Sequence, residues 1–107
     1  MKKKQEIMVI VDWNDNTTFS VEELSEICNV SSDWIQNLLE YGILEPHLGS
    51  SLATWRFDNR QLQRARTAVR LYHDLEVNEP GIALVLDLLE ELEEMRARAE
   101  VLEKYLK

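Results

Sequence analysis

The pattern of apolar and polar residues divides the first part of the chain into a short strand and a short helix. Residues 7–13, IMVIVDW, are apolar and largely β-branched, and turn-forming residues 14–16 follow them, so a strand is predicted there. Ser20 and Glu23 then form a capping-box pattern that opens a helix through about Asn29. The inner face of this helix would hold Val21, Leu24, Ile27 and Cys28.

A second short helix follows the turn NVSS at residues 29–32. Either Ser31 or Ser32 can cap its start, and Gly42 is expected to end it. Its buried side would hold Trp34 or Ile35, together with Leu38 and Leu39. Two short helices joined by a tight turn are typical of a helix-turn-helix.

The middle of the chain predicts a small wing and a longer helix. Residues 52–57 are β-like, follow a Gly-Ser turn and could pair with residues 7–13. Asp58 and Gln61 give a cap signal for a helix from Asn59 to about Val77, which Asn78 would stop. One stripe of this helix would hold Leu62, Ala65, Val69, Tyr72 and Leu75.

The last segment predicts a long helix with a heptad seam. Pro80 suits the first position of a helix, because its missing N–H would have no partner there. Apolar residues then recur at alternating steps of three and four. The seam begins at Val85 and continues through six expected dimerisation residues, Leu88, Leu92, Met95, Ala99, Leu102 and Leu106.

A helix of about 27 residues is about 40 Å long, so it projects beyond any core that this chain can form. We therefore expect its distal seam to pair with a second copy. The alternative is that the seam folds back over the chain's own helix-turn-helix. Both can hold together if the proximal half packs inward while the distal half pairs.

These elements predict a mainly α fold: a winged helix-turn-helix with a small β wing and a long C-terminal dimerisation helix. At 107 residues the chain is expected to form a single domain, residues 1–107. Residues from about 5 to 77 would form the winged helix-turn-helix, and those from about 80 to 107 the long helix.

Composition predicts a cytoplasmic protein without a catalytic or metal site. The longest apolar runs are far too short to cross a bilayer, and the stretch after the basic residues 2–4 is too short for a signal peptide. The single Cys28 is expected to be structural. His47 and His73 lack ligand-spaced neighbours, and the paired carboxylates lie on solvated helical faces. No enzyme activity, metal or cofactor is therefore expected.

The charge distribution favours a protein partner over DNA. The net charge is −8, and nine carboxylates lie between Lys4 and the next basic residue, Arg56. The second helix has no Lys or Arg, which DNA-reading helices use for guanine edges and phosphates. One basic cluster keeps a DNA-binding regulator open as the alternative: Arg56, Arg60, Arg64, Arg66 and Arg70. Surface ion pairs with Asp58, Asp74 and Glu76 are the other expected fate of these arginines.

An acidic surface steers a protein toward a basic partner, and apolar groups among the charges supply affinity. The first candidates for this contact are Asp33, Trp34 and Glu40 on the second helix. The next are Glu22, Glu23 and Glu26 on the first helix. The run EELEE at residues 90–94 is a second candidate surface.

Two blocks of the sequence resemble known families. Residues 19–46, FSVEELSEICNVSSDWIQNLLEYGILEP, are similar to the helix-turn-helix of MerR-type regulators. Residues 55–95 are very similar to the bacterial chaperone-modulator family of the CbpM type. The residues that carry the second resemblance are Phe57-Asp58, AVRL at 68–71, His73-Asp74-Leu75 and Pro80-Gly81-Ile82-Ala83.

The resemblance implies a dimeric modulator that binds the J-domain of a DnaJ-like co-chaperone of the CbpA type and blocks its work with Hsp70 (DnaK). J-domains engage Hsp70 through a basic helix, so a competitor should be acidic, as this chain is. MerR-type readers have arginines in and beside the second helix, where this chain has Asp33, Gln36 and Asn37. Because no contact residues are carried over from the family, the expected contact surface rests on charge and geometry.

Overall fold

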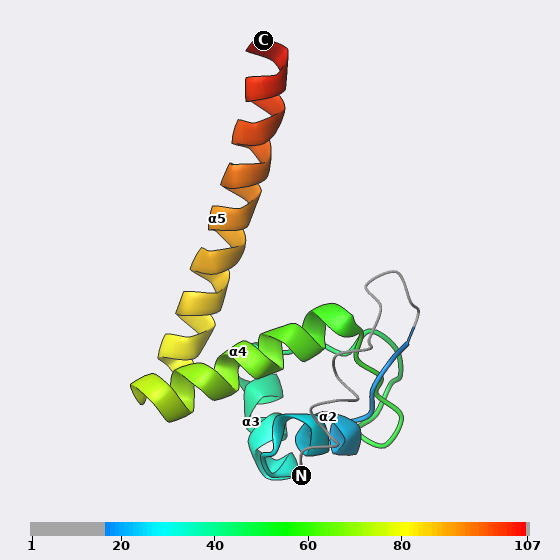
Figure 1. Cartoon of the computed structure of the whole chain (residues 1–107). Helices are drawn as coiled ribbons and strands as arrows, with labels where there is room; N and C mark the ends of the chain where they lie inside the picture. Colours follow the sequence, from blue (N-terminus) through cyan, green and yellow to red (C-terminus); the bar gives the residue numbers. More distant parts are fainter. Residues whose placement is uncertain (1–16, 107) are drawn as a thin grey trace.

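The chain forms four α-helices within residues 17–106, the part that the computed structural model describes. They are α2 (Val21–Cys28), α3 (Ser32–Glu40), α4 (Asn59–Leu75) and α5 (Glu79–Leu106). Helices α2 and α3 lie against α4, and α5 leaves this body as a long arm (Figure 1). The strand predicted at residues 7–13 lies outside the described residues.

Helix α2 begins at the predicted capping box. The Ser20 hydroxyl accepts a hydrogen bond from the Glu23 backbone N–H at 3.1 Å, and the Glu23 carboxylate accepts one from the Ser20 N–H at 2.8 Å. Asn29 ends the helix in the left-handed conformation, which turns the chain sharply into α3. The predicted first helix is therefore confirmed.

Helix α3 is capped by Ser31, whose hydroxyl accepts a hydrogen bond from the Trp34 backbone N–H at 3.1 Å. Ile35 and Leu38 are fully buried, as a helix that packs through one stripe requires. Gly42 has a φ of +72°, a conformation that costs glycine little, and it turns the chain back toward the core.

The two serines at the start of α3 are expected to respond differently to replacement. Ser31→Ala should cost about 1 kcal/mol of unfolding free energy, because it removes the cap. Ser32→Ala should change stability little or raise it slightly, because Ser32 is already helical and Ala has the higher helix propensity. Urea denaturation of both variants checks this. Equal losses would contradict the assignment of Ser31 as the cap.

The predicted β segment at residues 52–57 is largely wrong. Residues 52–54 form a turn, which the Thr54 hydroxyl stabilises by accepting hydrogen bonds from the backbone N–H groups of Ser50 and Ser51. Only isolated bridges remain in the described residues, Leu48 with Arg56 and Phe19 with Phe57. A turn-forming Ser-Ser pair and Thr54 thus prevail over the β propensity of the segment.

The core joins residues from all four helices and from the bridges. Leu24, Leu38 and Leu62 are fully buried, one from each of α2, α3 and α4, and Phe57 lies among them with no exposed surface. Helix α5 contributes its first turns, where Ile82 and Leu86 belong to the same core. The base of α5 is therefore held by the hydrophobic core.

The stripe predicted on α4 is correct at its start and wrong at its end. Leu62 and Ala65 are buried together with Ala68, which was not predicted, whereas Tyr72 is 43% and Leu75 is 68% exposed. Helix α4 extends past α2 and α3 at its C-terminal end (Figure 1). Leu71 still packs against the core there and Tyr72 contacts the ring of Trp34, but Leu75 is left exposed. The helix ends at Leu75, two residues before the predicted end at about Val77.

Asn78 starts the next helix; it does not stop α4 as predicted. Its side-chain oxygen accepts a hydrogen bond from the backbone N–H of Gly81 at 2.9 Å, an N-cap interaction. Helix α5 begins at Glu79, so Pro80 is its second residue and not the first. Proline is still tolerated there, since N–H groups of the first turn have no intrahelical partner.

Candidate protein-binding surfaces

The exposed acids of α2 and α3 form one candidate surface, called here the acidic α2–α3 surface. Its members are Glu22, Glu23, Glu26, Asp33 and Glu40, all of them exposed. Asp33 and Glu40 are seven residues apart, which places them on the same side of α3, two turns from each other. Helix α3 therefore presents carboxylates where a DNA-reading helix presents basic groups.

Glu23 also stabilises the fold. Besides its capping role, its carboxylate lies 3.6 Å from the guanidinium of Arg56. Arg56 in turn donates hydrogen bonds to the side chain and the carbonyl of Thr18, at 3.0 and 2.9 Å. Glu23 is therefore partly committed within the chain.

Trp34 lies at the junction of α3 and α4. Its ring is half-buried, and its centroid is 5.4 Å from that of Tyr72 in a tilted arrangement. Its indole N–H is buried and has no hydrogen-bond partner. Trp34 thus helps α3 to pack, and its expected role in partner contact stays a prediction.

The heptad seam of α5 is exposed in the single chain. Leu92 is 43%, Met95 61% and Leu106 85% exposed, while Ile82 and Leu86, which flank the first seam residue Val85, are buried in the core. The alternative in which the seam folds back over the helix-turn-helix is therefore wrong. The first turns of α5 pack inward, where Val85 is half-buried, and the seam from Leu88 onward remains exposed, as the interpretation with an inward proximal part allows.

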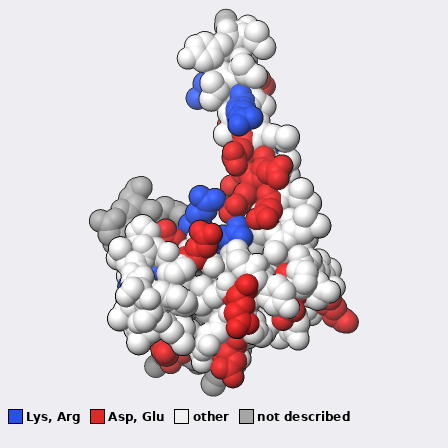
Figure 2. All heavy atoms as spheres, turned by 180° about the vertical axis from the view of Figure 1, so that it is seen from behind, with Lys and Arg blue, Asp and Glu red and all other residues white. Residues whose placement is uncertain are grey.

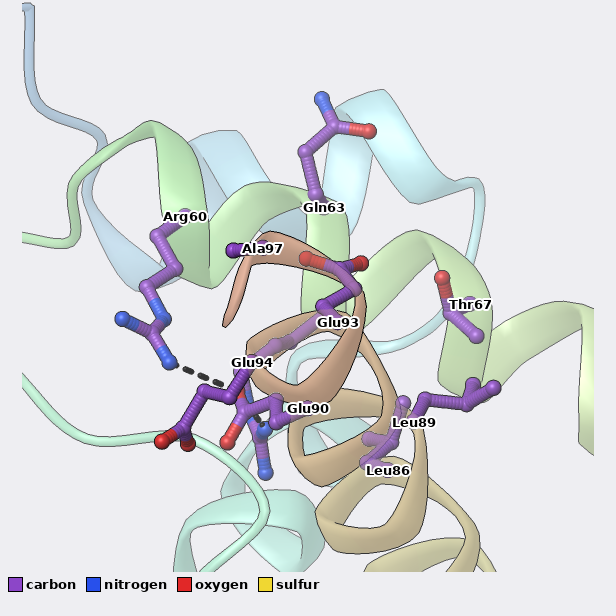
Figure 3. Close-up of a pocket in the computed structure, with 10 residues that line it drawn as sticks. Arg60, Gln63, Thr67, Leu86, Leu89, Glu90, Glu93, Glu94 and Ala97 are labelled. Carbon is purple, nitrogen blue, oxygen red and sulfur yellow. Dashed lines mark hydrogen bonds and ion pairs between the residues drawn. The ribbon is translucent and has the colours of Figure 1, made fainter. Parts of the chain in front are cut away.

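A groove of about 660 Å³ lies between α4 and α5 (Figure 3). At one end of it, Glu90 of α5 pairs with two arginines of α4: its carboxylate is 3.0 Å from the Arg60 guanidinium and also accepts a hydrogen bond from Arg64. Arg64 further donates from Nε to the Ile43 carbonyl at 2.7 Å. This cluster ties α5 to α4 and to the end of the helix-turn-helix.

The Glu90 cluster corrects the predicted ion pairs of the arginines. The sequence predicts Asp58, Asp74 and Glu76 as partners, but the structure pairs Arg60 and Arg64 with Glu90. The only sequence signal for this cluster is the spacing of four residues that places Arg60 and Arg64 on one side of α4. Their common partner is distant in sequence and is brought near by the packing of α5.

The arginines set the ionisation of Glu90. Burial disfavours its charged form, but hydrogen bonds and charges from Arg60 and Arg64 outweigh this and hold the pKa of Glu90 below its usual value. The hydrogen bond that Arg60 donates to the Glu90 carboxylate also raises the pKa of Arg60. The cluster is therefore fully charged at neutral pH.

Replacing Glu90 by Gln is expected to lower the free energy of unfolding by about 1–2 kcal/mol at neutral pH, because Arg64 is mostly buried and loses its charged partner. The folded-state pKa of Glu90 is depressed, so its contribution is present above the ordinary value of 4.5 and is lost as pH falls through the folded-state pKa. Urea denaturation at several pH values measures both effects.

Glu94→Gln is the matched control, because Glu94 is exposed and lies one turn further along α5. This variant should change stability by less than about 0.5 kcal/mol. If Glu90→Gln is no more destabilising than Glu94→Gln, the cluster does not hold α5 in place.

Cys28 behaves as a packing residue. Its side chain is half-buried beside the core, and burial raises the pKa of its thiol to about 11, although the charge of Arg66 acts in the opposite direction. The thiol is therefore protonated and unreactive at neutral pH. Within residues 17–106, no group of His, Cys, Asp and Glu side chains is placed to hold a metal ion. No helix in that range is long and apolar enough to span a membrane.

The structure leaves few of the predicted DNA-contacting arginines available. Arg56 is engaged by Thr18 and Glu23, and Arg60 and Arg64 are engaged by Glu90. Arg66 and Arg70 are exposed on α4.

Comparison with known proteins places the chain in a family. Residues 19–104 match the sequence model of the family described as MerR HTH family regulatory protein. The chaperone modulatory protein CbpM of Coxiella burnetii (strain Dugway 5J108-111) is 39% identical over 90 residues, which cover 84% of each chain. The CbpM of Pseudomonas entomophila (strain L48) is 37% identical over 83 residues, covering 78% of this chain and 81% of the relative. The CbpM of Pseudomonas putida (strain W619) is 32% identical over 83 residues, which again cover 78% of this chain and 81% of the relative. The chain therefore belongs to the MerR helix-turn-helix family, and within it to the group of the CbpM chaperone modulatory proteins.

Proposed function

We propose that the protein is a non-enzymatic chaperone modulator that acts in the cytoplasm. It binds the J-domain of a DnaJ-like co-chaperone of the CbpA type and prevents that domain from engaging Hsp70 (DnaK). The names of relatives that align over most of the chain support the chaperone role. The observation that carries the binding mode is the charge of α3, a helix in the position of a DNA-reading helix without a basic side chain.

The outward side of α3 suits a basic protein helix. Asp33 and Glu40 are exposed on it, and Gln36 and Asn37 are half-buried between them. Phosphates would be repelled by these carboxylates, whereas lysines and arginines of a helix would be attracted. Glu22 and Glu26 on α2 extend the same negative surface. The J-domain is proposed to bind the acidic α2–α3 surface through the basic helix that it offers to Hsp70.

We also propose that the protein is a homodimer that pairs through the seam of α5. Exposed leucines repeated at heptad spacing on a projecting helix support this, because isolated helices rarely leave such a seam in water. The acidic α2–α3 surface belongs to the body and α5 projects away from it (Figure 1). A dimer would therefore offer two separate J-domain sites.

Titration calorimetry with a purified J-domain tests the proposal, together with an assay of J-domain-stimulated Hsp70 ATPase activity. We expect binding, and loss of the stimulation as the protein is added. Affinity should fall as salt rises from about 50 to about 500 mM, because exposed charges are screened over roughly 8 Å at physiological ionic strength. An affinity that does not depend on salt would contradict the acidic-surface mechanism.

A DNA-binding regulator is the competing function, because the matched family is described as one of helix-turn-helix regulatory proteins. Duplex DNA should be titrated beside the J-domain. Tight, sequence-specific DNA binding that is lost on replacing both Arg66 and Arg70 by Ala would overturn the proposal.

A further inference from the structure

The aromatic rings of Trp34 and Tyr72 meet where the start of α3 lies against the last turns of α4. Their centroids are 5.4 Å apart, and Tyr72 also contacts the ring of His73 edge-on, at a centroid distance of 5.5 Å. Tyr72 nevertheless remains 43% exposed, and Trp34 is half-buried. An exposed ring that two neighbours hold in place is pre-organised for a contact, because little side-chain entropy is left to lose on binding.

Packing alone does not account for the residue at position 34. The indole N–H of Trp34 is buried and has no hydrogen-bond partner among the described residues, which costs stability. Phenylalanine would pack beside Tyr72 without that cost, since its ring has no polar atom. Tryptophan and tyrosine are, however, the rings whose faces attract cations most strongly. The pair therefore has the composition of a cation-binding surface.

The two segments that carry these rings are negatively charged. Residues 29–42, which include α3, contain two acids, and residues 71–79, at the end of α4, contain three. Neither segment contains Lys or Arg. Figure 2 shows acidic side chains projecting from the body below the base of α5, whereas the prominent basic side chains lie beside α5 and along it. The surroundings of the pair thus favour a cation over an anion.

One carboxylate flanks each ring along the chain. Asp33 precedes Trp34 and is exposed. Glu76 follows Tyr72 by four residues and stays close to it, since its backbone N–H donates to the Tyr72 carbonyl at 3.1 Å. Arg70, the basic residue nearest in sequence, is two residues before Tyr72 and therefore about 200° around α4 from it. The exposed part of the Tyr72 ring thus faces away from the chain's own arginine.

We infer that the Trp34–Tyr72 pair binds a cationic side chain of the partner, an arginine that stacks on the exposed part of the Tyr72 ring with its charge near Asp33 and Glu76. Arginine fits better than lysine, because its planar guanidinium stacks on a ring and is more weakly hydrated. The inference rests on the proposed function, since the basic helix of the J-domain would supply the arginine. It goes further, because it extends the contact from the acidic α2–α3 surface onto α4 and names its anchor.

Replacing Tyr72 by Phe and by Leu separates a cation contact from a purely apolar one. Phe keeps the aromatic face, so Tyr72→Phe should bind the purified J-domain within about twofold of the unmodified chain. Leu keeps an apolar side chain but has no aromatic face, so Tyr72→Leu should bind about fivefold to tenfold more weakly. Titration calorimetry measures both affinities. Equal affinities for the two variants would overturn the inference.

Glu76→Lys is a second test, because it places a lysine of the chain itself beside Tyr72, where it competes with the cation of the partner. J-domain binding should weaken about tenfold. Asp74→Lys is the matched control, since it makes the same charge change at an exposed residue that helical spacing places on the other side of α4 from Tyr72. It should lose less than about threefold. If both variants weaken binding alike, overall charge draws the partner and the inference is wrong.

The unmodified chain separates the two levels of failure. If it does not bind the J-domain, the proposed function itself is wrong. If it binds and Tyr72→Leu binds equally well, only the inference is wrong. Tyr105→Leu should leave the affinity unchanged, because this 84% exposed tyrosine lies at the far end of α5. Circular dichroism at 222 nm and urea denaturation should show that each variant stays folded, so that a loss of affinity reports the contact.

Discussion

Replacement of Phe57 by Ala is expected to lower the free energy of unfolding by about 3–5 kcal/mol. Phe57 has no exposed surface and packs in the core with residues from all four described helices. Its backbone is fixed as well, because its N–H donates to the Phe19 carbonyl and its own carbonyl accepts from the Phe19 N–H, both at 2.8 Å. Because these hydrogen bonds fix the backbone at this position, the core cannot easily collapse into the space left by the ring, so a cavity should remain.

Urea denaturation followed by circular dichroism measures this loss. Since domains of this size are stable by only about 5–15 kcal/mol, the Ala variant can approach the limit of folding. Phe57→Leu therefore provides a second point, with an expected loss of about 1–2 kcal/mol. Leu52→Ala is the control, because Leu52 is 45% exposed on the neighbouring turn and should cost less than about 0.5 kcal/mol. Similar losses for Phe57→Ala and Leu52→Ala would contradict the described core.

The helix boundaries are the part of the fold that the sequence predicts best, because caps act locally. Ser20 with Glu23, and Asp58 with Gln61, bond within three residues, so their patterns are visible in the sequence and are confirmed in the structure. The sequence does not distinguish Ser31 from Ser32 as the cap, since either hydroxyl has the right spacing to a backbone N–H. Only the three-dimensional course of the turn selects Ser31.

The elements that the sequence predicts poorly depend on distant parts of the chain. Tyr72 and Leu75 have the spacing of a buried stripe, but burial requires neighbours. Tyr72 is covered in part by Trp34 of α3, and Leu75 is exposed because α4 extends past α2 and α3 at that end. Glu90 looks like one more solvated acid of the run at residues 90–94 until α5 brings it to Arg60 and Arg64. Periodicity indicates which side of a helix is apolar, but not how far its partner extends.

The acids of the candidate surface could be placed from helical spacing, but their engagement could not. Asp33 and Glu40 lie exposed on one side of α3 as the spacing predicts. The Glu23 carboxylate both caps α2 and lies beside the guanidinium of Arg56. Trp34 of α3 packs against the ring of Tyr72 on α4. These contacts make Asp33 and Glu40 the sharper positions for testing partner binding, since changing them disturbs the fold least.

Replacing both Asp33 and Glu40 by Lys is expected to weaken J-domain binding by a factor on the order of 100. The change removes two attractions and adds two repulsions on the side of α3 proposed to meet a basic helix, and charges near the centre of an interface can each be worth more than 1 kcal/mol. Both residues are exposed, so stability should change little. Titration calorimetry with the J-domain measures the affinity, and the Hsp70 ATPase assay should show that inhibition is lost in parallel.

Asp74→Lys combined with Glu100→Lys is the matched control, because it changes the net charge equally at exposed sites on the last turn of α4 and on distal α5. If overall charge alone drew the J-domain, both pairs would weaken binding alike. If α3 makes the contact, the control should lose less than about threefold, the size expected from long-range attraction under physiological screening. Binding that survives Asp33→Lys with Glu40→Lys would move the J-domain site away from α3 and leave residues 90–94 of α5 as the acidic surface to test next, since Glu91, Glu93 and Glu94 there are exposed.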